Sequence, residues 1–161
     1  MKILIGLDLA TKLGISVFDI TSEKLVFSDS VKLPKGDTQL RVLALYDYLK
    51  EMFNKYKPTE IAVEDVFLPA KTSPRTPIAL GELRGIARLC AAQNNLPVFF
   101  YPARKVKMAI TGFGNACKDD IVCWIQNEFK IKVKEDNEAD GISIGYTHLL
   151  ERRFLACVSG G

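Results

Sequence analysis

Histidine, tryptophan and paired cysteines are scarce in this chain of 161 residues. It has one histidine (His148), one tryptophan and four cysteines, and no two cysteines form a Cys-x-x-Cys pair. Structural zinc sites are built from clustered Cys and His side chains, so these counts argue against a zinc centre. The ligands of any bound metal would have to be oxygens, which favours Mg²⁺ or Mn²⁺. We expect the four thiols to be reduced and mostly buried.

Long apolar runs are also missing. No stretch approaches the ~20 apolar residues that a membrane-spanning helix requires. The apolar run at residues 3–7 is interrupted by Asp8 and is shorter than the core of a secretory signal peptide. We therefore expect a protein that acts inside the cell and has no membrane partner.

The charges are unevenly distributed, although the net charge is only +3. Acidic side chains concentrate between residues 135 and 140, near the start of the expected last helix. A local group of acids beside basic stretches suits a metal site that faces a polyanion. The basic residues fall into two groups, which are Arg104, Lys105, Lys107 and Lys118, and Arg75, Arg84 and Arg88.

The hydrophobic pattern predicts a single α/β domain over residues 1–158, followed by a flexible tail at 159–161. Three consecutive strands with short links predict an antiparallel meander, and two later strands alternate with helices. The predicted fold is a mixed five-stranded sheet, made of this meander plus two helix-connected strands, with helices on both faces. The predicted strands are 2–8, 14–20, 24–33, 60–64 and 97–101, and the predicted helices are 38–57, 78–94, 103–111, 118–128 and 138–155.

Several details refine this pattern. Asp37 is a suitable N-cap for the helix at 38–57. Residues 69–77 contain three prolines and are expected to form a loop. Gly81 and Gly85 lie four residues apart within the next predicted helix, where glycine lowers helix propensity. Their spacing suggests that another backbone packs closely against this helix.

Three carboxylates stand at positions that suit metal chemistry. Asp8 and Glu64 each end a buried strand, and Asp140 lies at the start of the last predicted helix, three residues after Asn137. Each has an ordinary alternative role, because strand ends and first helical turns often carry capping acids. If the two strands adjoin, however, the carboxylates raise one another's pKa unless a cation neutralises them. Three such carboxylates suit two-metal hydrolysis of a phosphodiester.

The sequence also resembles a known family, the RuvC-type Holliday-junction resolvases, through an ordered set of motifs over nearly the whole chain. The resemblance implies a ribonuclease-H-like fold in a homodimeric, Mg²⁺-dependent endonuclease, with Mn²⁺ as a substitute, that nicks four-way DNA junctions. It also implies a cytoplasmic protein of a bacterium or a phage-infected cell. The motifs are Ile-Gly-Leu-Asp at 5–8, Gly-Ile-Ser at 14–16, Ala-Val-Glu-Asp-Val-Phe at 62–67, Gly-Glu-Leu-Arg-Gly at 81–85, Tyr-Pro-Ala-Arg-Lys-Val-Lys at 101–107, Thr-Gly-Phe-Gly-Asn at 111–115 and Ala-Asp-Gly-Ile-Ser-Ile at 139–144.

The resemblance implies roles for individual residues. Asp8, Glu64 and Asp140 match metal ligands, and Lys107 and Lys118 match lysines that contact the scissile phosphate or support the site. Phe67 matches an aromatic residue that stacks on bases near the junction centre, and the helix from Gly81 to Cys90 would lie at or near the dimer interface. The remaining residues to which we assign DNA binding, for their positive charge, are Lys71, Arg75, Arg84, Arg104 and Lys105.

These accessory residues have ordinary alternatives. Without the resemblance, Phe67 would be assigned to the core, and Lys107 and Lys118 to the solvated surface. The segment from Lys71 to Arg75 is either a DNA-contacting loop or a solvated one. His148 is expected to be exposed or to pack between helices rather than to act in catalysis.

The chain departs from the family pattern at one position. The family usually has a fourth acid three residues before the third one, and Asn137 stands there. An amide oxygen can bind Mg²⁺, but it brings no charge. Three explanations are open. Asn137 is a weaker native ligand, Asp136 or Glu138 takes its place, or an Asp was replaced to obtain an inactive protein.

Three other functions compete with a junction resolvase. Asn137 favours a junction-binding protein that no longer cuts, and a relaxed nuclease for branched DNA is also compatible with the motifs. Residues 4–11 and Gly14 also resemble the phosphate loop of actin-like kinases and ATPases. Those proteins need a second lobe and a later Gly-rich adenosine motif, which this chain lacks, so we expect no nucleotide cofactor.

Overall fold

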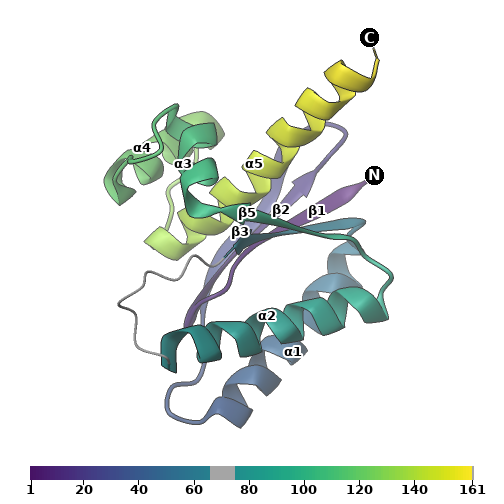
Figure 1. Cartoon of the computed structure of the whole chain (residues 1–161), viewed down its shortest axis with the longest axis vertical. Coiled ribbons are helices and arrows are strands. Elements are labelled where there is room, and N and C mark those ends of the chain that lie inside the picture. Colours follow the sequence, from purple (N-terminus) through teal and green to yellow (C-terminus); the bar gives the residue numbers. More distant parts are fainter. Residues whose placement is uncertain (66–74, 161) are drawn as a thin grey trace.

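A computed structural model describes residues 1–65 and 75–160, so the predicted DNA contacts Phe67 and Lys71 lie outside the described residues. Within these ranges the chain forms five strands and five helices around one sheet (Figure 1). The strands are β1 (Ile3–Asp8), β2 (Lys12–Asp19), β3 (Lys24–Lys32), β4 (Glu60–Asp65) and β5 (Val98–Pro102). The helices are α1 (Thr38–Tyr56), α2 (Arg75–Gln93), α3 (Ala103–Thr111), α4 (Lys118–Phe129) and α5 (Asp136–Ser159).

The sheet has the strand order β3-β2-β1-β4-β5. The first three strands pair antiparallel, and β1, β4 and β5 run parallel. Leu7 pairs with Val63, so the next residue of each strand, Asp8 and Glu64, comes to the same edge of the sheet. This is the predicted meander with two helix-connected strands, and the predicted fold is confirmed.

Helices cover both faces of the sheet, and each face has its own core. Figure 1 shows α1 and α2 on one side and α3, α4 and α5 on the other. Alternate residues of β1 point to opposite faces, as strand geometry requires. Ile5 and Leu7 pack in the core with α1 and α2, whereas Leu4 packs in the core with α5. Asp8 continues the Leu4 register and therefore faces the helices α3 to α5.

Glycines let the first half of α5 lie directly on the strands. A Cβ atom at Gly14 would stand 1.8 Å from the carbonyl oxygen of Asn137, and one at Gly6 would stand 2.7 Å from the backbone of both Gly141 and Gly145. No side chain fits between these backbones. The Ser16 hydroxyl donates to the carbonyl of Gly141 at 2.8 Å and fixes the contact. This seating brings the first turns of α5 to the ends of β1 and β4.

The predicted elements all exist, with small shifts at their ends. Asp37 caps α1 as predicted, since its side chain accepts from the Leu40 amide at 3.2 Å. Helix α2 begins at Arg75, so the loop predicted through residue 77 was wrong at its last three positions. Pro77 lies in the first turn of α2, where proline is tolerated because the amides there have no helical partner. Helix α5 extends from Asp136 to Ser159 and is longer at both ends than predicted.

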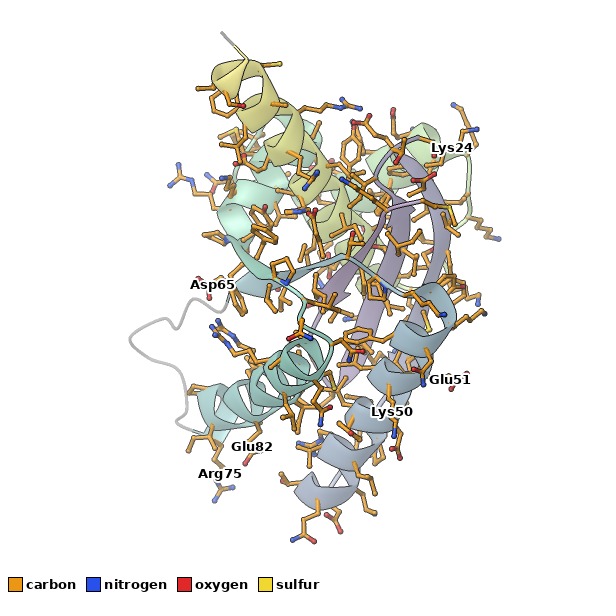
Figure 2. The ribbon with its side chains drawn as sticks, turned by 90° about the vertical axis from the view of Figure 1, so that its right-hand side faces the viewer. Lys24, Lys50, Glu51, Asp65, Arg75 and Glu82 are labelled. Atoms are coloured by element: carbon orange, nitrogen blue, oxygen red, sulfur yellow. The ribbon has the colours of Figure 1, made fainter. Side chains whose placement is uncertain are left out.

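The expectation of mostly buried thiols was wrong, and the close packing expected at Gly81 and Gly85 stays a prediction for a second chain. No atom outside α2 lies within 4 Å of a Cβ placed at Gly81 or Gly85, so no backbone of the described chain packs there. Both glycines lie on the outer side of α2, and Figure 2 shows Arg75 and Glu82 of this helix pointing away from the body. The thiols are free, but only Cys90 is buried, because the other three lie on outward positions at the start of α4 and within α4 and α5. In the described ranges, no helix combines the length and apolarity needed to cross a membrane.

Candidate active site

The ends of β1 and β4, helix α3 and the starts of α4 and α5 surround a cavity of about 310 Å³. The sequence prediction placed three carboxylates at one edge of the sheet, and all three line this cavity. The polar and charged side chains in its wall are Asp8, Glu64, Lys107, Lys118, Asn137, Asp140 and Ser143.

Asp8 and Glu64 form the floor of the cavity. Asp8 is 7% exposed, and its carboxyl group and that of Glu64 line the same cavity. Burial, followed by the charge of Asp140, raises the pKa of Asp8 to about 6. Burial, followed by the charges of Asp8 and Asp140, raises the pKa of Glu64 to about 7. Without an added cation, the pair therefore resists carrying two negative charges near neutral pH.

Asp140 forms one wall and has a basic partner. The Nζ atom of Lys118 lies 3.5 Å from an Asp140 carboxylate oxygen, and the charge of Lys107 also acts on Asp140. Burial raises the pKa of Asp140, and Lys118 opposes that rise. Lys107 lines the cavity from α3, and Lys118 lines it from the first residue of α4. Both lysines therefore bring positive charge to the cavity that holds the three carboxylates.

Asn137 occupies the position of the fourth family acid. It lines the cavity, and its Nδ2 atom lies 3.4 Å from a carboxylate oxygen of Asp8. Glu138 cannot replace it in this conformation. Its carboxylate is buried and accepts from the Ser28 hydroxyl at 2.6 Å and from the Lys134 amide at 2.7 Å. Asp136 is exposed and does not line this cavity.

The donor atoms of the cavity suit a hard divalent ion. Three carboxylates and one amide offer only oxygen ligands, as Mg²⁺ and Mn²⁺ prefer, and no thiol or imidazole is among the lining residues. Burial, followed by the neighbouring carboxylates, raises the pKa values of Asp8 and Glu64, so a bound cation would favour their charged forms. Over residues 1–65 and 75–160, no three acidic, His or Cys side chains converge into a ready-made cage. The carboxylates instead line the wall of an open cavity. Their oxygen atoms, with that of the Asn137 amide, suit Mg²⁺ or Mn²⁺.

Other predicted DNA contacts lie around this cavity. A second depression shares Asp8, Ala10 and Glu64 with it and extends to Leu80. A third depression continues past Leu80 to Arg75 at the start of α2. The three hollows share lining residues, and Arg75 lines the one farthest from the carboxylates. The DNA-binding role of Arg75 stays a prediction.

The remaining predicted cations have protein partners. Arg84 lies 3.1 Å from Asp65 and stacks 4.5 Å from the centre of the Phe100 ring. Lys105 lies 3.0 Å from Glu151, outside the lining of the cavity. The exposed side chain of Arg104 contacts the loop between α3 and α4. The DNA-binding roles of these three residues stay predictions.

A buried polar cluster under α5 was missed by the sequence reasoning. His148 is 2% exposed, its Nε2 atom lies 2.6 Å from Glu60, and its Nδ1 atom lies 2.6 Å from the Tyr101 hydroxyl. Arg152 donates to the other oxygen of Glu60. Burial lowers the pKa of His148. The expectation of a helix-packing histidine describes it, but only its partners, 47 and 88 residues away in the chain, reveal the cluster.

Comparison with known proteins agrees with this geometry. The family model described as "Crossover junction endodeoxyribonuclease RuvC" matches residues 4–148. A protein of that name from Pseudothermotoga lettingae is 40% identical over 115 residues, which are 70% of each chain. Another from Legionella pneumophila is 28% identical over 165 residues, covering 99% of this chain and 94% of the other.

Solved structures share the fold. The RuvC structure from Thermus thermophilus superposes with a TM-score of 0.81 at 24% identity, over 94% of this chain and 96% of that one. The same protein in complex with a Holliday junction substrate gives a TM-score of 0.79 at 22% identity, over 96% of each chain. The family match, which extends over most of the chain, excludes the actin-like alternative. This chain belongs to the RuvC family of crossover junction endodeoxyribonucleases.

Proposed function

We propose that this chain is a divalent-metal-dependent endonuclease that resolves four-way DNA junctions by paired nicks, and that Mg²⁺ is its metal. The observation that carries the proposal is the meeting of Asp8, Glu64 and Asp140, from two strands and a helix, in one cavity beside two lysines. Relatives across the family are named as crossover junction endodeoxyribonucleases, which supplies the substrate class.

The protein's own groups support hydrolysis of a phosphodiester. Asp8, Glu64 and Asp140 would hold the ions, with the amide oxygen of Asn137 as an uncharged fourth ligand. Such ions would lower the pKa of the attacking water and stabilise charge on the leaving oxygen. Lys107 and Lys118 bind and orient the scissile phosphate. Water adds to phosphorus and the bond to the 3′ oxygen breaks, which leaves a 5′-phosphate and a 3′-hydroxyl.

Paired cutting requires two active sites, which a homodimer would supply through the outer face of α2. Ile78 is 63% exposed and Leu89 is 47% exposed on this helix. With Gly81 and Gly85 they recur every three or four residues and form one apolar face with little side-chain bulk. Two copies of this face can approach closely about a two-fold axis, which matches the symmetry of a four-way junction.

A cleavage assay tests the proposal. Labelled four-way junction, Y-fork, flap and linear duplex of shared sequence are incubated with the wild-type protein in Mg²⁺ and, separately, in Mn²⁺. We expect symmetric nicks in the junction and little cutting of the duplex. Equal cutting of forks and flaps would favour the relaxed nuclease.

One observation favours a second function, a junction-binding protein that does not cut. Asn137 leaves the cavity one negative charge short of the family pattern. Retarded junction without nicks in both metals would support this function. If cleavage then appeared in Asn137→Asp, the missing charge would be the cause.

A further inference from the structure

The loop between α3 and α4 presents a large aromatic side chain to solvent. Phe113 is 60% exposed, although both its backbone amide and its backbone carbonyl are hydrogen-bonded. Its amide donates to the Thr111 hydroxyl oxygen at 3.2 Å, and its carbonyl accepts from the Ala116 amide at 3.1 Å. The Thr111 hydroxyl donates to the carbonyl of Lys107 at 2.9 Å and so connects the turn to α3. The exposed ring is thus carried by a turn whose backbone is hydrogen-bonded.

In the sequence, Phe113 lies between two basic residues, Arg104 before it and Lys118 after it. The side chain of Arg104 lies against the loop, since a Cβ atom at Gly114 would be 3.0 Å from its Cγ and 3.1 Å from its Nε. Lys118, which faces Asp140 in the cavity, follows five residues after Phe113. One nearby acid, Asp120, is engaged locally, because its carboxylate accepts from the Cys117 amide at 3.2 Å. Asp119 is exposed in the same first turn of α4.

An exposed ring in a segment that also carries Arg104 and Lys118 fits a nucleic-acid strand better than an apolar partner. Proteins that hold unpaired nucleotides combine basic side chains along the backbone with aromatic rings on which the bases stack. A stable protein interface needs about 800 Å² on each partner, far more than one exposed ring supplies. Five residues of extended chain span at most about 17 Å, so Phe113 lies within about five nucleotides of a phosphate at Lys118, at ~3.4 Å per nucleotide along one strand.

We propose that Phe113 stacks on a nucleobase of the DNA strand whose phosphate is held at the carboxylate cavity. This inference rests on the proposed function and adds an aromatic contact to it on the α3–α4 side of the cavity. The contact is separate from the role assigned to Phe67, which follows β4 in the chain. Phe113 would hold the strand near the nick by its base, while Lys107 and Lys118 hold it by phosphate.

Four variants test the proposal on a four-way junction in EDTA, so that binding is measured without cutting. They are Phe113→Ala, Phe113→Leu, Phe113→Tyr and the control Phe154→Ala. Phe154 is 64% exposed and lies fourteen residues after Asp140 on α5, about 21 Å along the helix axis. We expect Phe113→Ala to weaken binding about tenfold, within the range for loss of one base–aromatic stack. Phe113→Tyr should bind as wild type, and Phe154→Ala should change binding less than twofold.

A fluorescent base separates stacking from general apolar contact. Junctions carry 2-aminopurine at successive positions within five nucleotides of the mapped nick. We expect at least one position to be quenched by the wild type and by Phe113→Tyr, but not by Phe113→Ala or Phe113→Leu. Equal binding and equal fluorescence for wild type, Phe113→Ala and Phe113→Leu would overturn the inference, as would equal losses in Phe113→Ala and Phe154→Ala.

Failure of this inference can be told apart from failure of the proposed function. A wild type that cuts junctions, with Phe113→Ala unchanged in binding and fluorescence, removes the stacking contact alone. A wild type that binds no branched DNA overturns both. Because the Phe113 side chain is exposed, all variants are expected to show the thermal unfolding midpoint of the wild type, which circular dichroism checks.

Discussion

Strand β4 carries two glutamates on the same face, and they meet opposite surroundings. Glu60 lies beneath α5 with His148 and Arg152 as partners, so its charge is compensated within the chain. Glu64, four residues further along, meets Asp8 and Asp140 and has a pKa raised to about 7. Both side chains face α5, which supplies a cation to one carboxylate and a third carboxylate to the other.

The difference separates a structural use of buried charge from a functional one. Removing a partner from a compensated cluster leaves buried groups unpaired, so the Glu60 cluster should hold α5 on the sheet. The carboxylates around Glu64 repel each other in the protein alone, and ions from solution would relieve that repulsion. The four predictions below test this contrast, starting with the largest expected effect.

Asp8→Asn should abolish cleavage, with a loss of roughly 10³-fold or more, because the cavity loses a charged ligand for the ions. Binding of the four-way junction in EDTA should be kept or become tighter, since a negative charge that repels phosphate is removed. Gel assays of nicking and binding measure the two effects. Asp47→Asn, on the exposed side of α1, is the control and should leave both unchanged. Loss of binding with cleavage chemistry intact would contradict the role of Asp8.

Asn137→Asp should tighten divalent-ion binding about tenfold, because each charged ligand strengthens a hard-cation site. Isothermal titration with Mn²⁺ in the absence of DNA measures this change without relying on activity. The neighbouring variant Asp136→Asn removes a charge outside the cavity and should change the affinity much less. Equal affinities for wild type and Asn137→Asp would show that residue 137 does not face the ions.

Glu60→Gln and Glu64→Gln make the same chemical change on one strand and should shift stability in opposite directions. Glu60→Gln should lower the free energy of unfolding by about 1–3 kcal/mol, because it removes charged hydrogen bonds to His148 and Arg152. Glu64→Gln should raise it by about 1 kcal/mol at pH 8 in EDTA, because like-charge repulsion is lost. Urea unfolding measures both. A destabilisation of similar size in both variants would erase the contrast between the two ends of β4.

The stability of the metal-free protein should also depend on pH through Asp8 and Glu64. Their folded-state pKa values, about 6 and about 7, lie above the ordinary values of 3.8 and 4.5. Raised acid pKa values favour the protonated form in the folded state, so their stabilising effect is full below about pH 4 and is lost as pH rises through 7. The wild type should therefore approach Glu64→Gln in stability at pH 5 and fall below it at pH 8.

His148 gives the opposite trend, because its lowered pKa favours the folded state at higher pH. Both proteins contain His148, so its contribution cancels when the stability of Glu64→Gln is compared with that of the wild type. Unfolding in EDTA at pH 5, 6, 7 and 8 supplies the data. Saturating Mn²⁺ should stabilise the wild type more than Glu64→Gln at pH 8. A difference between the two proteins that stays constant over this range would mean that Glu64 does not titrate in it.

Much of this arrangement could be predicted from local sequence patterns. Period-two and helical patterns predicted every element, and two strands ending in carboxylates predicted that Asp8 and Glu64 would meet. Asp140 was proposed as the third carboxylate of the same group, but a first-turn acid also has an ordinary capping role, and the family resemblance favoured the metal-binding role. The seating of α5 through Gly14 and Gly141 was not predicted, since glycines 127 residues apart carry no local signal of their contact.

The Glu60–His148 cluster was missed for the same physical reason. In the sequence, Glu60 is an acidic residue at the start of a strand, and His148 is one polar residue on a long helix. Only tertiary packing brings them together. The packing expected at Gly81 and Gly85 has no partner within the described chain. A second copy of the chain is the partner we propose.

Anomalous diffraction from crystals soaked in Mn²⁺ most directly tests whether the uncompensated acids at the end of β4 gather ions. We expect one or two anomalous peaks within coordination distance of Asp8, with Glu64 and Asp140 oxygens as further ligands, and no peak beside Glu60. Crystals with saturating Mn²⁺ and no peak at Asp8, or with ions bound only elsewhere, would contradict the metal-dependent nuclease proposed for this chain.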